Sequence, residues 1–310
     1  MFPSASNTTE SKPRKTRYTI DDSVCPPTKS YLLEAAVQKA CRCLPLYLQH
    51  RPIDAKTRQP FQKLLQQLAT DLECGNGDLL EFILTAYPSG IILDSGCGTG
   101  RSTRFLASEY PENLVLGIDR SIARLTKSKD NRKDGVDSGM RQDYVHRVAP
   151  NAYLIRAELV DFWRCCIDHD ANFWTNHIFH HYILYPNPYP TPQRLTQRWY
   201  AHSSFPLLLH LNAHKVVVRS NWEAYLKEFS MAVEIAYDFY NREGTNSPPF
   251  NLRSLIDSQK SYNPALPYLE SAKLGPHERT DKLFAWTNFE AKYDKVEERT
   301  FELVLHHQER

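Results

Sequence analysis

Residues 91–100 have the sequence IILDSGCGTG, in which a short apolar run is followed by three glycines at alternate positions. A continuous apolar run such as Ile91-Ile92-Leu93 is typical of a parallel β-strand that is buried on both faces. Glycines directly after such a strand let the backbone pass close to a ligand, and a helix that begins there favours negative charge at its N-terminus. The stretch therefore predicts a strand, a ligand-binding turn and a helix over about residues 102–109.

A second predicted strand, residues 113–118, ends in Asp119, twenty-five positions after Asp94. The two strands and the helix between them form a βαβ unit, and the carboxylate of Asp119 can accept hydrogen bonds from two ribose hydroxyls. The spacing G-x-G-x-G differs from the G-x-G-x-x-G of dinucleotide-binding folds, and no Gly-Lys-Ser follows for a nucleoside triphosphate. The two strand ends predict a site for a nucleoside that carries a small carboxylate.

The remaining pattern predicts an α/β fold with a mostly parallel sheet flanked by helices. Further strands are expected at residues 152–156, 177–184, 215–219, 283–289 and 300–307, and further helices at 31–47, 61–72, 78–85, 203–211 and 222–240. The first of these helices should end at Pro45, because proline cannot donate to the helical hydrogen-bond ladder. The last two strands follow one another without a helix, which predicts an antiparallel hairpin at the sheet edge.

Three regions divide the chain of 310 residues, a length that one hydrophobic core can accommodate. Residues 1–30 hold ten Ser or Thr and four Pro, which predicts a flexible arm. Residues 31–90 form an N-terminal helical extension, and residues 91–310 form the α/β domain. Within that domain, residues 120–147 and 244–282 have the composition of insertions, and the first of them is basic and a candidate RNA-binding surface.

The overall charge excludes some classes of partner. Thirty-eight Lys and Arg against thirty-six Asp and Glu give a net charge of +2, so any RNA contact has to come from local clusters, and no DNA partner is expected. No apolar run approaches the ~20 residues of a membrane-spanning helix. No C-x-x-C or H-E-x-x-H element sets a ligand geometry, so no metal site is predicted.

The seven cysteines are an odd count at ordinary density, and no secretory signal precedes them. We therefore expect a reducing, cytoplasmic location, although the Ser- and Arg-containing arm leaves organellar targeting open. We expect a monomer or a homodimer.

A second motif lies at residues 185–190, Tyr-Pro-Asn-Pro-Tyr-Pro, directly after a predicted strand. Prolines on both sides hold Asn187 in an extended turn at the carboxyl edge of the sheet, beside the glycine turn. Arg194 and Arg198 follow at helical spacing with Trp199, a mixture that can contact phosphates and stack on bases. The alternative is a proline-rich surface loop.

These motifs resemble a known family. Residues 93–100, LDSGCGTG, resemble the glycine-rich loop of class I S-adenosylmethionine-dependent methyltransferases. The YPNPYP string with Arg194 and Arg198 is similar to the FPDPWPKKRH region of the tRNA (guanine-N7-)-methyltransferase family. Residues 219–225, RSNWEAY, are similar to its T-D-W-x-x-Y segment, and residues 287–290, TNFE, to its T-K-[FY]-E motif. The resemblance extends from about residue 61 to residue 305.

The resemblance implies a Rossmann-like class I methyltransferase that transfers a methyl group from S-adenosyl-L-methionine to N7 of a guanosine in tRNA. It implies that the cofactor is bound by Asp94, Gly96, Gly98, Gly100, Asp119 and Glu158, the last of these near the adenine. It also implies that the guanosine is faced by Asn187, Asn221, Thr287 and Glu290. Arg194 and Arg198 would contact the phosphates of the RNA.

Two positions depart from the family pattern, which has Asp where this chain has Asn187 and Asn221. Guanine N7 carries a free lone pair and no proton, so its methylation needs orientation and contact distance more than a general base. We hypothesise that Glu290 supplies the negative charge that the two asparagines lack. Two alternatives remain: a methyltransferase of the same fold with another substrate, and a non-catalytic RNA-binding or scaffold protein.

Overall fold

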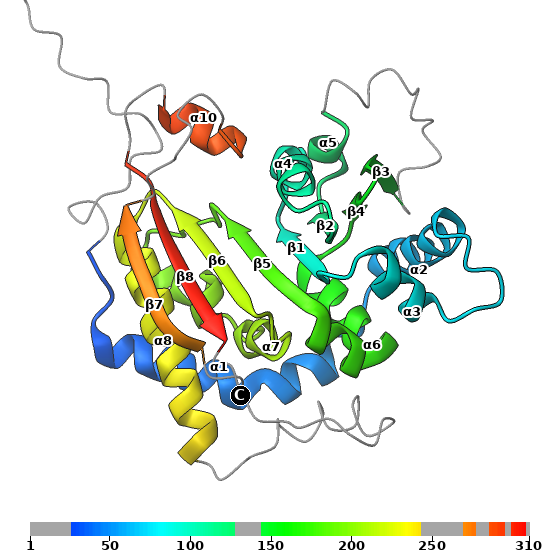
Figure 1. The fold of residues 1–310 in the computed structure, drawn as a ribbon. Helices are drawn as coiled ribbons and strands as arrows, with labels where there is room; N and C mark the ends of the chain where they lie inside the picture. The colour runs from blue at the N-terminus through cyan, green and yellow to red at the C-terminus, as the bar shows by residue number, and fades with distance from the viewer. Residues whose placement is uncertain (1–25, 128–143, 243–268, 277–284, 295–298, 308–310) are drawn as a thin grey trace, which may run out of the picture.

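The computed structural model describes residues 26–127, 144–242, 269–276, 285–294 and 299–307 (Figure 1). In this part of the chain eight strands form one sheet, in the order β3-β4-β2-β1-β5-β6-β8-β7. The strands are β1 (Ile91–Ser95), β2 (Leu114–Asp119), β3 (Val145–Ala149), β4 (Ala152–Arg156), β5 (Ile178–Leu184), β6 (Lys215–Ser220), β7 (Leu269–Pro276) and β8 (Phe301–His307).

The five central strands, from β4 through β2, β1 and β5 to β6, pair in parallel. On one side β3 pairs antiparallel with β4, and on the other β8 pairs antiparallel with both β6 and β7. Every residue of β1 and β2 is buried, as their continuous apolar sequences predict. The predicted fold class, a mostly parallel sheet with an antiparallel hairpin at its edge and helices around it, is confirmed.

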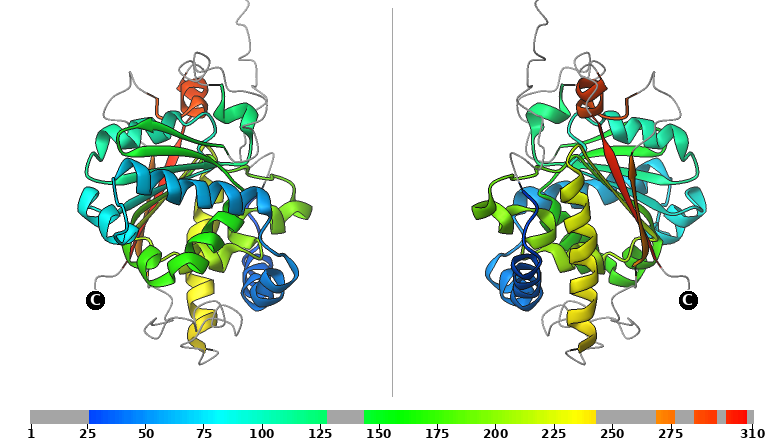
Figure 2. Two further views of the ribbon diagram at one scale, coloured as in Figure 1. Left: turned by 90° about the vertical axis from the view of Figure 1, so that its right-hand side faces the viewer. Right: turned by 90° about the vertical axis from the view of Figure 1, so that its left-hand side faces the viewer.

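The helices cover both faces of the sheet. They are α1 (Ser30–His50), α2 (Ala55–Asp71), α3 (Leu79–Ala86), α4 (Arg101–Glu109), α5 (Ile122–Leu125), α6 (Leu159–His177), α7 (Phe205–His210), α8 (Glu223–Arg242) and α10 (Asn288–Asp294), with the 3₁₀ helices η3 (Pro192–Gln197) and η4 (Trp199–Ala201). Helices α1, α2, α6, α7 and α8 contribute to one hydrophobic cluster, and α4 and α10 to another that includes Ile92 and Val115. Helix α1 packs against α8 and crosses it, as the nearly end-on α1 beside the lengthwise α8 in Figure 2 shows.

The N-terminal helices are stabilised locally by capping and globally by burial. The side chains of Asp54 and Asp78 accept hydrogen bonds from the backbone at the first turns of α2 and α3. Helix α1 continues to His50, so the predicted end at Pro45 is wrong. Leu44 and Leu48, on either side of this proline, are both buried, and this packing sustains the helix although Pro45 donates no hydrogen bond.

The strand predicted at residues 283–289 is also wrong in the described part. Residues 285–287 lie in a loop, and Asn288 begins α10. The hairpin partner of β8 is β7, which lies inside the stretch that composition assigned to an insertion. The sequence also did not predict strand β3 or the helices α5 and α6, nor the short 3₁₀ helices η3 and η4.

The predicted three-part division is only partly described. Residues 1–25 of the arm and most of the first insertion, residues 128–143, lie outside the described residues. Helices α1, α2 and α3 place Leu33, Leu64 and Ile83 in the same hydrophobic cluster as β1. The helical extension therefore packs directly on the sheet. Within the residues described, no helix combines the length and apolar character required to cross a membrane.

Candidate active site

The glycine turn after β1 has left-handed backbone at all three glycines. The φ angles of Gly96, Gly98 and Gly100 are 85°, 63° and 74°, a region that residues with a side chain rarely adopt. A Cβ atom at Gly96 or Gly98 would meet no described atom within 4 Å, whereas one at Gly100 would lie 2.6 Å from the side chain of Leu154. The first two glycines therefore border open space, and the third permits close packing of α4 on the sheet.

Asp119, the last residue of β2, is hydrogen-bonded to this turn. Its Oδ2 accepts a hydrogen bond from the backbone N–H of Gly98 at 3.0 Å, and its Oδ1 accepts one from the N–H of Ser121 at 2.7 Å. Arg124 Nη2 lies 3.0 Å from Oδ1. Burial raises the pKa of Asp119, while these hydrogen bonds and Arg124 oppose the shift.

Asp94 has a different environment. It is buried, and its Oδ2 accepts hydrogen bonds from the hydroxyls of Ser102 and Thr103, both at 2.7 Å. Burial raises the pKa of Asp94 to about 6. Its side chain faces α4 and does not line the cavity described next, so its role in the structure is to join β1 to the first turn of α4.

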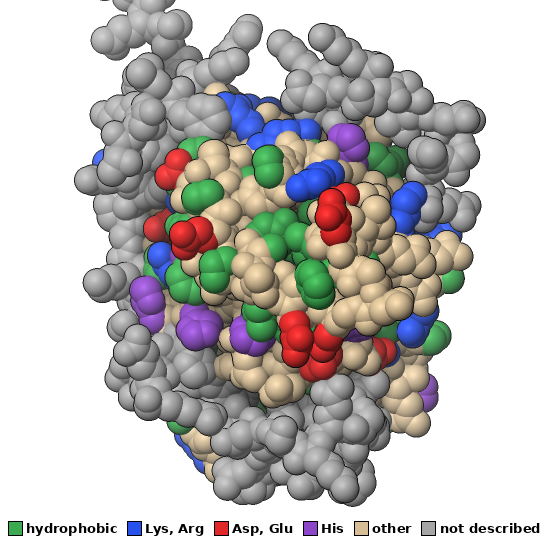
Figure 3. All heavy atoms as spheres, turned by 45° about the vertical axis from the view of Figure 1, so that its right-hand side comes forward, with side chains coloured by type: hydrophobic (Ala, Val, Ile, Leu, Met, Phe, Trp, Pro, Cys, Tyr) green, Lys and Arg blue, Asp and Glu red, His purple; other side chains and the backbone are tan. Residues whose placement is uncertain are grey.

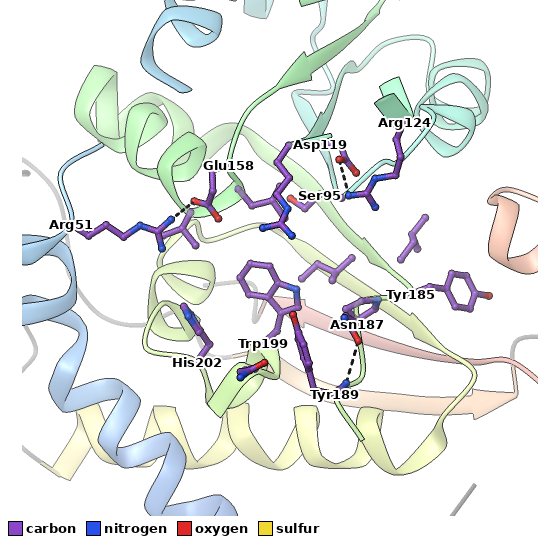
Figure 4. A pocket seen from close by; sticks show the side chains of 18 residues that line it. Arg51, Ser95, Asp119, Arg124, Glu158, Tyr185, Asn187, Tyr189, Trp199 and His202 are labelled. Carbon is purple, nitrogen blue, oxygen red and sulfur yellow. Dashed lines mark hydrogen bonds and ion pairs between the residues drawn. The ribbon is translucent and has the colours of Figure 1, made fainter. Parts of the chain in front are cut away.

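A cavity of about 450 Å³ opens at the carboxyl ends of β1, β2 and β5 (Figure 4). Four of the predicted site residues line it: Gly96, Asp119, Glu158 and Asn187. In parallel α/β sheets, ligands bind at this edge where the strand order reverses, which here is between β1 and β5. The cavity thus coincides with the place that the sequence predicts for the ligand.

Glu158 forms one wall of the cavity together with a residue of the helical extension. Its carboxylate accepts a hydrogen bond from the N–H of Asp161 at 3.0 Å and so caps α6. Arg51, in the segment between α1 and α2, lies 3.4 Å from Glu158, and Figure 4 shows the two side chains pointing toward one another. Burial raises the pKa of Glu158, and Arg51 opposes the shift.

Asn187 follows β5 in a turn with unusual backbone geometry. Tyr185 and Tyr189 on either side of it have positive φ angles of 55° and 42°, which non-glycine residues seldom adopt. The Asn187 side-chain oxygen accepts a hydrogen bond from the N–H of Tyr189 at 3.4 Å. Asn187 is exposed and lines the cavity, so its side chain borders the space that a ligand would fill.

The two predicted phosphate-binding arginines lie in different environments. Arg194 is exposed, and its guanidinium lies 4.4 Å from the ring centre of Tyr189. Arg198 is 1% exposed and forms an ion pair with Glu228 at 2.9 Å. The predicted contact of Arg198 with RNA is therefore wrong for this structure, because its guanidinium is taken out of water and bound in the interior.

The T-N-F-E segment is also internal. The Thr287 hydroxyl accepts a hydrogen bond from the N–H of Glu290 at 3.0 Å, and the Glu290 carboxylate accepts one from the N–H of Thr287 at 3.3 Å. This reciprocal pair is a capping box at the start of α10. Glu290 is 1% exposed, and its Oε1 lies 3.1 Å from both Arg219 Nη1 and the Tyr185 hydroxyl.

The predicted contact of Thr287, Glu290 and Asn221 with the guanosine does not fit this arrangement. All three are buried, and none of them lines the cavity. The structure does not support the hypothesis that Glu290 supplies negative charge to the substrate, because its carboxylate is buried and bound to Arg219, which also pairs with Glu302. Glu290 accepts a hydrogen bond from Tyr185, which does line the cavity.

Sequence reasoning missed several cavity residues. Arg51, Arg120 and Arg124 line it together with the aromatic side chains of Tyr189 and Trp199. Arg120 and Arg124 lie one and five positions after Asp119, so the charge pattern of that segment was the available signal. Arg51 has no such signal, because it reaches the cavity from a segment that precedes β1 by forty residues.

The described surface carries both signs of charge, as the net charge of +2 would suggest. Acidic and basic side chains are interspersed on the face shown in Figure 3. Among the described residues, no three His, Cys, Asp or Glu side chains gather as a metal-binding group would require. Six cysteines lie in the described ranges, and all of them are free thiols.

Comparisons with known proteins find similarity in solved structures alone. No family model matches the chain, and the search of curated proteins finds no match. A structure described as an antibiotic-related methyltransferase shares 14% identity over 74% of this chain and 94% of its own, with a TM-score of 0.42. The 16S rRNA methyltransferase KamB shares 15% identity over 74% of this chain and 93% of its own, with a TM-score of 0.39.

A third structure is a variant of the 16S rRNA (adenine(1408)-N(1))-methyltransferase from Catenulisporales acidiphilia with its cosubstrate SAM. It shares 13% identity over 79% of this chain and 92% of its own, with a TM-score of 0.38. Identities and TM-scores this low do not permit the activity of these proteins to be transferred to the chain.

Proposed function

We propose that the chain is an S-adenosylmethionine-dependent methyltransferase, with N7 of a guanosine in tRNA as the methyl acceptor. The observation that supports the cofactor most directly is the open space beside Gly96 and Gly98, next to Asp119. Glycine at these two positions leaves room for a ligand against the backbone, and a carboxylate at the end of the adjacent strand suits a ribose.

The donor fits the chemistry of the residues present. The backbone at Gly96 and the N-terminal end of α4 favour its small carboxylate, Asp119 offers oxygens to the ribose hydroxyls, and the family resemblance assigns Glu158 to the adenine. When bound, this cofactor supplies an electrophilic methyl group on a positively charged sulfur. The protein's own contribution is then to orient the acceptor and to exclude water from the cavity.

The acceptor side of the proposal rests on Asn187 and its neighbours. The exposed amide of Asn187 can donate to and accept from the edge of a base, and Tyr189 and Trp199 offer aromatic surfaces on the same cavity. Arg194 and Arg120 are exposed near this end of the sheet and can contact phosphates. The guanosine and the tRNA come from the family resemblance alone.

A different methyl acceptor is the second candidate function. The observation that favours it is the burial of Asn221 and Glu290 away from the cavity, since the resemblance assigns both to guanosine recognition. A non-catalytic RNA-binding protein of this fold remains a third possibility for the experiment to address. In each case we propose a reducing, cytoplasmic location.

The test is transfer of a tritiated methyl group from the donor to total tRNA, followed by identification of the labelled nucleoside. Labelled 7-methylguanosine supports the full proposal. Label in another nucleoside, or in another fraction of a cell extract, supports the second candidate. Absence of both transfer and donor binding by isothermal titration calorimetry contradicts the methyltransferase proposal, and donor binding without any transfer supports the non-catalytic alternative.

A further inference from the structure

A buried hydrogen bond between Ser95 and His181 lies at the floor of the cavity. Ser95 is the last residue of β1 and lines the cavity, although only 5% of it is exposed. His181 is on the neighbouring strand β5 and is completely buried. The Ser95 hydroxyl oxygen lies 2.8 Å from His181 Nε2, and the His181 ring packs edge-on against Trp163 at 5.5 Å.

The unpaired nitrogen of His181 identifies which partner donates in this bond. Its Nδ1 is buried without a hydrogen-bond partner among the described residues. An unpaired buried N–H group is rarer than an unpaired acceptor, so Nδ1 carries no proton and Nε2 carries it. Burial lowers the pKa of His181 to about 3, which keeps the ring neutral at physiological pH. His181 Nε2–H therefore donates to the Ser95 oxygen.

Because Ser95 accepts the hydrogen bond from His181, its own hydroxyl hydrogen remains available to donate to another group. Within the described residues, His181 is the single hydrogen-bond partner of the Ser95 side chain. A hydroxyl has one proton to donate and two lone pairs, and one lone pair already accepts from His181. The remaining donor lies on the cavity, directly before Gly96, where the turn and the start of α4 favour negative charge.

We infer that Ser95 donates a hydrogen bond to a carboxylate oxygen of the ligand's amino-acid part, and that His181 is the positioning residue that holds this hydroxyl in place. The inference deepens the proposed function and rests on it, because the carboxylate belongs to the proposed donor. It assigns to the cavity floor a preference for ligands that carry a hydrogen-bond acceptor at this point.

Two nucleoside probes separate this contact from the rest of the site. S-adenosylhomocysteine has the amino-acid part, whereas 5′-deoxy-5′-methylthioadenosine has the same nucleoside without it. A hydrogen bond to a charged group is worth enough to change affinity about tenfold. We expect Ser95→Ala to weaken S-adenosylhomocysteine binding about tenfold and to leave binding of the second probe unchanged. Equal loss for both probes, or no loss for either, would overturn the assignment.

Variants of His181 test its positioning role by the same titrations. We expect His181→Leu to weaken S-adenosylhomocysteine binding several-fold in the wild-type background and to have no further effect in Ser95→Ala. His181→Gln, whose amide N–H can donate to Ser95, should recover part of the loss. A decrease of equal size in both backgrounds would show that His181 acts independently of Ser95 and would overturn this role.

The protonation of His181 can be measured without any ligand. Nitrogen-15 correlation spectra of the imidazole distinguish a proton on Nε2 from one on Nδ1, and we expect it on Nε2. A proton on Nδ1 would overturn the inference even if the variants fail to fold. If the wild-type protein binds neither nucleoside probe, the proposed function fails, while the spectrum still decides the direction of the Ser95–His181 bond.

Discussion

Replacing Glu290 by Gln distinguishes a carboxylate that supports the fold from one that takes part in methyl transfer. Glu290 is 1% exposed, and its Oε1 lies 3.1 Å from Arg219 Nη1. Removing one partner of a buried ion pair costs about 3–5 kcal/mol, because the other charge is left in the interior. Arg219 retains Glu302 at 2.6 Å, so we expect the lower end, a loss of about 3 kcal/mol in the free energy of unfolding.

The measurement is urea denaturation of the wild type and the variant, followed by methyl transfer and donor binding under conditions where both are folded. The matched control is Glu223→Gln on α8. Glu223 pairs with Lys227 at 2.8 Å, and both side chains are about half exposed, so its loss should cost less than about 1 kcal/mol. We expect donor affinity of Glu290→Gln to stay within about twofold of the wild type, since the side chain does not line the cavity.

The opposite pattern would refute this reasoning. If Glu290→Gln keeps the stability of the wild type and loses turnover tenfold or more, the carboxylate acts on the substrate. The buried arrangement would then not be the one present during catalysis. Tyr185→Phe provides a further check, because it removes the hydrogen bond to Glu290 and leaves the charge pair intact.

Three further predictions concern other described residues. Asp119→Ala should weaken S-adenosylhomocysteine binding at least about tenfold by calorimetry, since hydrogen bonds to a charged group are lost; unchanged affinity would exclude a ribose contact. Arg194→Ala should reduce tRNA affinity without changing stability, and it should lower the slope of log affinity against log salt concentration by about one. Arg198→Met should instead lower the free energy of unfolding by about 3 kcal/mol. A stable Arg198→Met variant with weakened tRNA binding would contradict the buried ion pair. Burial lowers the pKa of His210 from 6.5 to about 4. As the pH falls below 6.5, the unfolded chain therefore binds a proton at this residue and the folded chain does not. This difference lowers the free energy of unfolding by about 2 kcal/mol at pH 5. Urea denaturation at pH 7.5 and pH 5 should show a smaller loss for His210→Leu than for the wild type, and equal losses would count against a neutral buried ring.

The parts of the fold that the sequence predicted well have local signals. Three features can each be recognised from a short stretch of sequence: the apolar run of β1, the alternate glycines and the carboxylate of Asp119. Together they locate the cavity. Asn187 lines the cavity, and its local signal is also short-range, because its flanking prolines and the preceding strand are adjacent in the sequence.

Helix α6 shows why other elements escaped prediction. Every residue from Val160 to Ile167 is buried, including the charged Asp161 and Arg164, so polar and apolar positions there do not mark an exposed and a buried face. Asp170 has non-helical backbone angles within it, which breaks the pattern further. The error at residues 283–289 has a related cause, because an apolar stretch that precedes a strand fits a strand as well as a buried loop and helix.

The misassigned site residues depend on contacts between distant segments. Arg198 is thirty positions from Glu228, and Arg219 is seventy-one positions from Glu290. The sequence shows that each of these groups is charged, but whether a charge faces water or an ion-pair partner depends on the packing of α8 and α10. For this reason the motif resemblance assigned to Arg198 and Glu290 roles that the structure does not support.

The position of Arg51 bears on how the chain can be divided. Arg51, whose guanidinium faces Glu158, comes before the first strand of the sheet in the sequence. A shortened protein that starts at β1 would retain all strands of the sheet and still lack one side of its binding chamber. Fragments designed around the α/β portion alone are therefore poor substitutes for the full polypeptide in any ligand-binding assay.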